Sequence, residues 1–228
     1  MKDTIVLTLN CGSSSVKYQV YNWDKQTIVC KGVVERIAIG DSFIKHEVPG
    51  QAVVEKKKEC ADHKEAIELI INTITGGKNP AIKDLSTVGA VGHRVVHGGD
   101  RFVKSILIDD KILEIFDELR DLAPLHNPPN ITGIKAAQKL MPDIPHIAVM
   151  DTAFLQTLPP KAYIYAVPYE WYKTYKIRRY GFHGSSHLYV SRRAAVLLKK
   201  KKNKVNIITC HLGNGVSFTA IRNGKAVD

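Results

Sequence analysis

The sequence predicts an α/β fold, on the strength of three observations. Short β-rich runs alternate with longer amphipathic segments along the 228 residues. Two similar strand–turn–strand units stand near the two ends, at 5–21 and 205–221, and both turn on glycine and serine. Hydrophobic residues make up 44% of the chain, which is ample for a packed core. Together these observations predict a mixed sheet with flanking helices, built from a repeated hairpin unit.

The first four expected strands follow from runs of β-forming residues. Residues 5–9 are apolar at nearly every position, which predicts a central strand. Residues 16–21 and 27–34 continue the sheet, with a turn between them. The alternating segment 43–54 predicts another strand pair, turned at Pro49-Gly50.

Further along the chain, helical periodicity takes over. Apolar residues three and four positions apart predict a helix over 63–74, which Gly76 and Gly77 end. The same spacing predicts helices over 109–122, 130–140 and 186–202, and short apolar runs predict strands over 88–96, 147–151 and 205–210.

The repeated hairpin also bears on domain organisation. In both units a polar residue ends the first strand, Asn10 in one and His211 in the other. We therefore expect one lobe over 1–204 and the first hairpin of a second lobe over 205–228. A lone hairpin cannot bury both its faces, so we expect a truncated chain. The alternative is that this hairpin packs onto the first lobe as an extra element.

Charge and cysteine content limit the kinds of binding partner and the cellular compartment that we expect. The net charge is +11, from 33 basic and 22 acidic residues. The run Lys199–Lys202 follows an apolar stretch and favours a solvated helix end over a nucleic-acid site, because no aromatic residues interleave with it. Four widely spaced cysteines without a CxxC pair suit a reducing cytosol. Without an apolar run of about 18 residues or a signal peptide, we expect a cytoplasmic protein with no membrane partner.

The turn after the first strand has the chemistry of a phosphate site. Gly12 allows a sharp turn and a close backbone approach to a ligand. Ser13, Ser14 and Ser15 supply hydroxyl groups, and successive turn amides can bind an anion. Lys17 adds a positive charge. An ordinary hairpin turn is the alternative, because the Walker spacing is absent.

Arginine and histidine mark the end of the strand expected at 88–96. Arg94 is suited to bidentate recognition of a carboxylate or phosphate, or to a structural ion pair. His93 and His97 are four residues apart. A zinc site is disfavoured here, because residues on a strand do not share a face at that spacing and no third ligand is near.

Three further segments present polar side chains at turns. His126 stands in a loop stiffened by prolines, and a structural histidine is the alternative. Asp151 ends a strand, where α/β proteins place ligand-binding groups; it would hold a metal, orient a base or cap the next segment. His183 lies between Gly181 and Gly184, and it either stabilises charge developing on a transferring group or is structural.

Six blocks of sequence, in this order, resemble the N-terminal part of the acetate kinase family. They are NCGSSSVK (10–17), GHRVVHGG (92–99), APLHNPPN (123–130), DTAF (151–154), RYGFHG (179–184) and HLGNG (211–215). The resemblance covers nearly the whole chain. It implies the superfamily of sugar kinases, heat-shock chaperone ATPases and actin, with two ribonuclease-H-like lobes and a cleft between them.

The resemblance also implies a reaction and its site. ATP and acetate would give ADP and acetyl phosphate reversibly, with Mg²⁺, in a full-length parent that forms a homodimer. The implied catalytic residues are Arg94, His126, Asp151 and His183, and Arg94 would also hold the acetate carboxylate. The implied methyl pocket is Val96, Leu125 and Phe182. The implied phosphate and ATP contacts are Asn10, Ser13, Ser15, Lys17, His211, Gly213, Asn214 and Gly215, and the implied magnesium ligands are Asn10 and Asp151.

Two departures from the family pattern qualify these expectations. Leu155 stands where the family usually has histidine after DTAF, and we expect only a tuning effect. The family's second half carries the adenosine pocket, so we expect the 228 residues alone to be inactive.

A kinase for propionate or another short acid is an alternative function, because one methylene discriminates between acids by only about 1–3 kcal/mol. A non-catalytic lobe that binds acetate or phosphate stays open as well.

Overall fold

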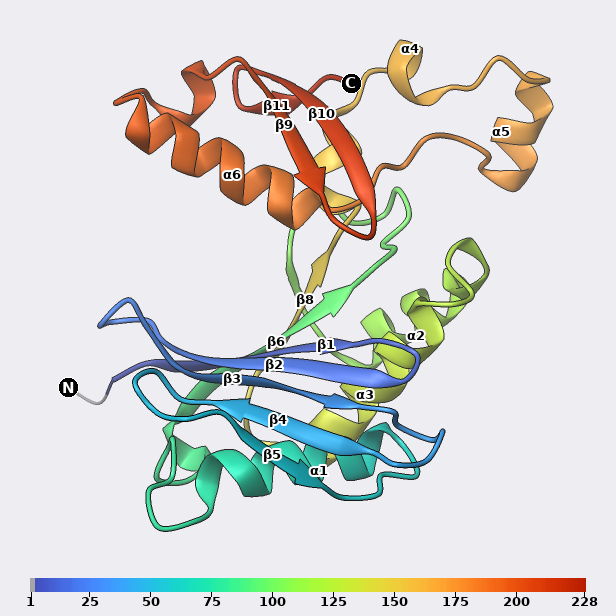
Figure 1. The fold of residues 1–228 in the computed structure, drawn as a ribbon. Coiled ribbons are helices and arrows are strands. Elements are labelled where there is room, and N and C mark those ends of the chain that lie inside the picture. Colours follow the sequence, from blue (N-terminus) through green and yellow to red (C-terminus); the bar gives the residue numbers. More distant parts are fainter. Residues whose placement is uncertain (1–2) are drawn as a thin grey trace. The chain divides into compact units, whose positions relative to one another are not determined.

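The computed structural model describes residues 3–228 and divides into two compact units (Figure 1). Unit 1 runs from the start of the described chain to Val95 and includes Ile106–Ala148. Unit 2 comprises Val96–Ser105 and Val149–Asp228. The boundaries fall after the strand that ends at Val95, before the strand that begins at Ile106 and within the strand His146–Met150. The expected division into 1–204 and 205–228 stays a prediction.

Unit 1 is built on an eight-stranded mixed sheet in the order β5-β4-β3-β2-β1-β6-β8-β7. Strands β1 to β5 form an antiparallel meander, and β6 runs parallel to β1. The predicted central position of β1 is therefore confirmed. The strands are β1 (Ile5–Cys11), β2 (Ser15–Asn22), β3 (Thr27–Glu35), β4 (Phe43–Glu47), β5 (Val54–Lys57), β6 (Val88–Val95), β7 (Ile106–Leu107) and β8 (His146–Met150).

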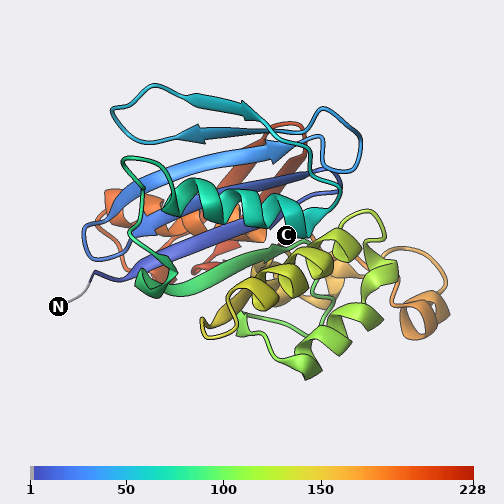
Figure 2. The same ribbon diagram turned by 90° about the horizontal axis from the view of Figure 1, so that it is seen from below.

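Two helices cover one face of this sheet, α1 (His63–Thr75) and α3 (Asn127–Leu140), and they pack against each other (Figure 2). Asp62 caps α1 by accepting a hydrogen bond from Glu65 N. The helix then presents its isoleucines to the sheet at three- and four-residue spacing, as the sequence predicts. The fully buried members of this stripe are Ile67, Ile70 and Ile74.

Helix α3 lies so close to β1 that only glycine fits between them. A side-chain carbon built on Gly133 would overlap Cys11 Sγ. Helix α2 (Asp110–Glu118) and the 3-10 turn η2 (Arg120–Leu122) precede α3, and the chain passes from η2 into the first turn of α3.

Unit 2 holds a three-stranded sheet, β11-β10-β9, with α6 packed along the β9–β10 hairpin (Figure 1). Leu155 is buried in a small apolar cluster with Leu158 and Ala226. The elements of this unit are η3 (Ala153–Thr157), α4 (Pro160–Tyr163), α5 (Tyr169–Tyr175), α6 (Gly184–Leu197), η4 (Lys202–Lys204), β9 (Ile207–Leu212), β10 (Val216–Arg222) and β11 (Lys225–Ala226).

The predicted helix over 186–202 is wrong at its C-terminal end. Helix α6 ends at Leu197, and Lys199 takes a left-handed φ of 52°. Lys200 N then donates to Ala195 O, which closes the helix at a reversed turn. The lysine run Lys199–Lys202 therefore lies beyond the helix rather than in its last turn.

The helix predicted over 130–140 begins three residues early, at Asn127, because prolines are tolerated in a first helical turn. Elements β7, α4 and β11 span four residues or fewer, too short to leave a periodic signal. Both predicted hairpins are confirmed as antiparallel pairs, β1 with β2 and β9 with β10. Within residues 3–228, no helix has the length and apolar character needed to cross a membrane.

Candidate functional site

The turn between β1 and β2 is short and tightly closed. Gly12 N donates to Ser15 O at 2.7 Å, and the strands pair Asn10 with Lys17 in register. Ser13 is exposed and Ser15 is half-buried. The predicted phosphate-facing groups of this turn are therefore gathered at one end of the hairpin.

Two buried side chains anchor this turn from the helices beneath it. Asn130 Nδ2 of α3 donates to Cys11 O at 2.6 Å. His63 Nε2 of α1 lies 2.6 Å from Gly12 O, so the ring nitrogen must be the donor. Sequence reasoning missed both anchors, because each joins positions more than fifty residues apart.

Arg94 comes to lie beside the Gly12–Ser15 turn through the parallel pairing of β6 with β1. Leu9 stands opposite His93, so the next residues, Asn10 and Arg94, are neighbours. Arg94 Nη1 donates to Asn10 Oδ1 at 3.4 Å. Two predicted site residues from distant segments are thus brought together in unit 1.

His93 beside Arg94 belongs to a buried histidine pair. His146 Nε2 donates to Met141 O at 3.1 Å, which leaves His146 Nδ1 to accept from His93 Nε2 at 2.8 Å. Burial lowers the pKa of His93 to about 3, and the neighbouring His146 adds to the effect. His93 is therefore a neutral structural residue.

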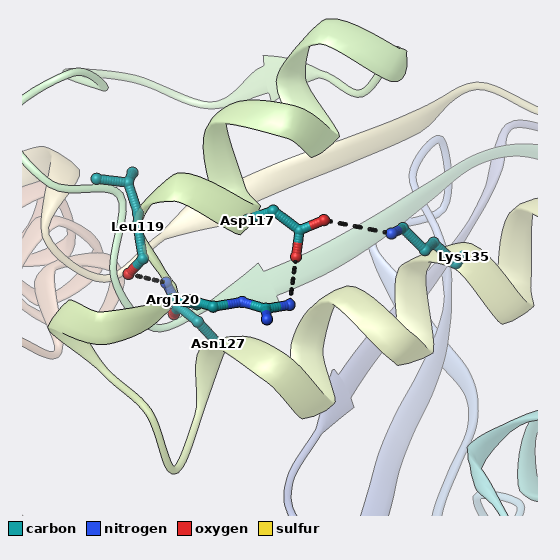
Figure 3. Close-up of polar contacts among 5 residues, drawn as sticks. All are labelled: Asp117, Leu119, Arg120, Asn127 and Lys135. Atoms are coloured by element: carbon teal, nitrogen blue, oxygen red, sulfur yellow. Dashed lines mark hydrogen bonds and ion pairs between the residues drawn. The ribbon is translucent and has the colours of Figure 1, made fainter.

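The loop that carries Leu125 and His126 is held in place by its flanks (Figure 3). Asn127 is fully buried, and its Nδ2 donates to Leu119 O at 3.3 Å. Asp117 pairs with Arg120 at 2.8 Å and with Lys135 of α3 at 3.5 Å. These contacts fix the turn between η2 and α3, and His126 and Leu125 are exposed on it.

In unit 2, Asp151 follows β8 directly and is 1% exposed. Its backbone oxygen accepts from Gly184 N at 2.8 Å, so the start of α6 lies against it. A side-chain carbon on Gly184 would overlap that oxygen, which explains the glycine. Nearby, Gly98 N donates to Thr152 Oγ1 at 3.1 Å.

The apolar residues expected around a methyl group fall on both units. Val96 and Phe182 belong to unit 2, where Val96 is buried. The ring of His97 meets Phe182 edge-on at 5.5 Å, and burial lowers the pKa of His97 to about 4. Leu125 belongs to unit 1 and is 77% exposed there.

His183 and His211 form a stacked pair in unit 2, with ring centroids 4.1 Å apart and planes inclined by 19°. His183 stands at the start of α6 with a left-handed φ of 56°, which is uncommon for residues other than glycine. A side-chain carbon on Gly215 would lie 3.0 Å from His183 Cε1. The predicted residues His183, His211 and Gly215 are therefore brought together, with Gly213 and Asn214 exposed in the same turn.

Further side chains support His183 and were missed from the sequence as site residues. Ser217, His187 and Thr209 form a chain of hydrogen bonds behind its ring, with contacts of 2.7–2.8 Å. Burial lowers the pKa of His187, and His183 and His211 add to the effect. The alternation of small polar residues along β9 and β10 is the signal that could have indicated them.

The donor set fits magnesium better than a transition metal. Residues 3–228 contain no cluster of three or more His, Cys, Asp or Glu side chains placed to hold a metal. The predicted ligands are the Asn10 amide oxygen and the Asp151 carboxylate. Mg²⁺ typically takes one or two carboxylates and completes its shell with water and substrate phosphates. Asn10 of unit 1 and Asp151 of unit 2 each offer an oxygen of the type that it binds.

Comparison with known proteins places this geometry in context. The chain is 59% identical over 224 residues to an acetate kinase of Geobacter metallireducens, and 55% identical over 223 residues to one of Thermotoga maritima. These matches cover 98% of the chain but 53% and 55% of the relatives. The chain thus spans about half the length of the curated relatives it matches.

Solved structures agree. An acetate kinase of Porphyromonas gingivalis superposes with a TM-score of 0.95 at 44% identity, over 99% of this chain and 56% of that one. A propionate kinase of Francisella tularensis gives 0.91 at 41% identity, with the same coverages. The predicted fold class, an actin-like α/β fold, is confirmed. The acetokinase family model matches residues 5–228, and the chain belongs to that family.

Proposed function

We propose that this chain carries the acid-binding and phosphoryl-facing residues of an ATP:carboxylate phosphotransferase, which makes acetyl phosphate and ADP from acetate and ATP. One observation carries the proposal: Arg94 lies at the end of β6, hydrogen-bonded to Asn10 beside the Gly12–Ser15 turn. A planar cation next to a phosphate-binding turn suits the two anions that must meet, a carboxylate and a γ-phosphate.

Phosphoryl transfer requires positioning and charge stabilisation more than covalent chemistry. In this proposal Arg94 holds the acetate carboxylate or the phosphoryl group in transit. His126 and His183 donate to the phosphoryl oxygens as charge develops on them. Support comes from the contacts around them: Asn127, next to His126, donates to Leu119 O, and the ring of His183 stacks on that of His211.

The nucleotide and its metal complete the proposed site. Ser13, Ser15 and Lys17 of unit 1 would contact phosphate oxygens, and so would the turn from His211 to Gly215 of unit 2. Asn10 and Asp151 would each supply an oxygen to Mg²⁺, which would neutralise charge on the phosphates when bound. The exposure of Ser13, Lys17 and Gly213 supports their availability to a ligand.

Acetate is the acid we propose, and propionate is the second candidate. Val96, Leu125 and Phe182 would wall the pocket for the methyl group. The similarity of this chain to a propionate kinase structure is the reason to test the longer acid as well. One methylene changes the discrimination by only about 1–3 kcal/mol, so the two acids are distinguished by measurement.

Other features of the proposal concern the whole protein. Because the relatives are about twice as long, we propose that the 228 residues alone have little activity. We also propose that the protein is cytoplasmic and that a full-length parent of this chain forms a homodimer. We propose no nucleic-acid partner, since the exposed lysines after α6 have no aromatic neighbours in sequence.

The test is a hydroxamate assay for acyl phosphates with ATP, magnesium and a series of acids. It compares the 228-residue chain with the same chain extended by the unmatched part of the Geobacter metallireducens relative. We expect the extended chain to turn over acetate fastest and propionate more slowly, and the short chain to show little product. An extended chain that folds but forms no acyl phosphate with any acid would overturn the proposal.

A further inference from the structure

The Gly12–Ser15 turn lacks the backbone bond that commonly closes such a turn, from the amide of the fourth residue to the oxygen of the first. Gly12 N donates to Ser15 O at 2.7 Å, but the reverse bond, from Ser15 N to Gly12 O, is not formed within residues 3–228. Gly12 O instead accepts from Nε2 of His63, the buried first residue of α1, at 2.6 Å. A side chain from a helix therefore replaces a backbone bond of the turn.

The contact with His63 fixes the direction of the next amide along the chain. Gly12 O and the Ser13 N–H belong to one peptide unit, which is planar and trans, so the two groups point in opposite directions. Because Gly12 O is turned towards the His63 ring, the Ser13 N–H points away from that ring. Ser13 is exposed, and no group within the described residues 3–228 accepts a hydrogen bond from its amide.

Neighbouring backbone oxygens, which would repel an anion, are occupied by other donors of unit 1. Asn130 Nδ2 donates to Cys11 O at 2.6 Å, and Ile37 N donates to Ser14 O at 3.0 Å. The Ser14 amide, like that of the residue before it, has no acceptor within the described part of the chain. Two successive amides of a turn that have no acceptor can bind an anion together.

We propose that His63 is a positioning residue for anion binding: it holds Gly12 O and thereby directs the Ser13 N–H to a phosphate group. That the phosphate belongs to a nucleotide rests on the proposed function, but the role of His63 in the turn does not. Without the ring, Gly12 O is left with Ser15 N or water as its donor. The first bond would close the turn and the second would let the Gly12–Ser13 peptide rotate, so either change weakens the Ser13 donor.

The start of α1 gives His63 a fixed base. Asp62 Oδ1 accepts from Glu65 N at 2.9 Å, and Glu65 Oε2 accepts from Ala61 N at 2.8 Å, so the two side chains cap the helix reciprocally. The helix is in turn held on the sheet by its buried isoleucines. A donor fixed in this way needs no rearrangement when the anion binds, which is the property expected of a positioning residue.

The test is an NMR titration of the ¹⁵N-labelled 228-residue chain with tripolyphosphate and, separately, with inorganic phosphate. In the wild type the Ser13 amide proton should shift downfield to saturation, and the tighter probe identifies the source as a phosphate chain or a free phosphate ion. His63→Leu removes the donor and should raise the Kd about tenfold, as the loss of one charge-assisted hydrogen bond would. His63→Gln keeps an N–H donor and should bind nearly as the wild type does.

His46→Leu is the matched control, because it also removes a buried histidine bond of unit 1, from His46 Nδ1 to Tyr18 Oη at 2.6 Å, but not one to the turn. It should leave the Kd unchanged, which separates positioning from a general loss of stability. A folded His63→Leu that binds as the wild type does would overturn the proposal. A wild-type Ser13 amide that responds to neither probe would overturn it without any variant.

The titration needs no turnover, so its result is independent of the kinase assay. An extended chain without kinase activity contradicts the proposed function alone. An active kinase whose Ser13 amide does not respond contradicts this inference alone.

Discussion

At the scale of single residues, buried polar side chains hold the candidate site in shape. Asn130 and His63 bond to the backbone oxygens of Cys11 and Gly12, and Asn127 holds the start of α3 by its bond to Leu119 O. The sequence indicates the reactive residue types at the turns, because Gly, Ser, Arg and His stand there in recognisable blocks. It could not indicate these anchors, since an asparagine in a helix looks the same whether or not it meets a distant carbonyl.

Asn130→Ala tests one of these anchors. The change leaves Cys11 O without its donor, and a buried unsatisfied group costs about 1–3 kcal/mol. We expect a loss of that size in the free energy of unfolding, measured by urea denaturation, and faster hydrogen exchange at the amides of Gly12–Ser14. Thr132→Ala, an exposed change in the same helix, is the control and should have little effect. Equal stability of the two variants would contradict the assignment.

The buried histidines make stability depend on pH. The pKa of His93 is about 3 in the folded chain, below the ordinary value of about 6.5 that it regains on unfolding. Above pH 6.5 neither state binds the proton. As the pH falls from 6.5 towards 3, only the unfolded state binds it, so each such ring removes about 1.4 kcal/mol of stability per pH unit.

His97, with a pKa of about 4, contributes in the same direction over a narrower range. We therefore expect urea midpoints to fall between pH 7.5 and pH 5, and His93→Gln to reduce the slope. A urea midpoint that stays constant between pH 7.5 and pH 5 would show that His93 and His97 are not buried in their neutral form.

At the scale of elements, the packing of α3 on β1 decides where the site residues lie. The sequence predicts β1 from its apolar run and α3 from its helical spacing, and it predicts most strand boundaries within two residues. It does not predict where α6 ends. The helix is closed by a left-handed backbone at Lys199, and lysine is not a residue type that indicates such a turn. It also cannot predict that Gly133 meets Cys11, which is a tertiary contact.

Gly133→Ala should test this contact. The new methyl group would overlap Cys11 Sγ, and overpacking in a core typically costs about 1–3 kcal/mol. Cys11→Ala removes the sulfur, so the double variant should be more stable than the sum of the two single losses predicts. Urea denaturation of the four proteins measures the coupling. Additive losses would mean that α3 and β1 are not in contact at this point.

At the scale of the whole molecule, the four cysteines report whether the chain is folded. Cys11, Cys30 and Cys60 are buried, and Cys210 is exposed. Burial raises the pKa of the Cys11 thiol to about 12 and that of Cys30 to about 11, so neither forms the reactive thiolate.

A colorimetric thiol reagent should therefore titrate one group in the native chain and four in denaturant. Cys210→Ser should remove the native reaction and leave three groups in denaturant. Rapid native reaction of two or more thiols would show that the core of unit 1 is open.

The measurement that tests the account most directly is the rate of acetyl phosphate formation by the extended chain with Arg94→Ala. The control is Arg193→Ala, which removes an exposed arginine from α6. If Arg94 stabilises the transferring group, its loss should lower kcat/KM by roughly 10²–10³-fold, with Arg193→Ala near wild type. If Arg94→Ala folds and retains the wild-type rate, Arg94 is not in the site and the proposed function loses its main support.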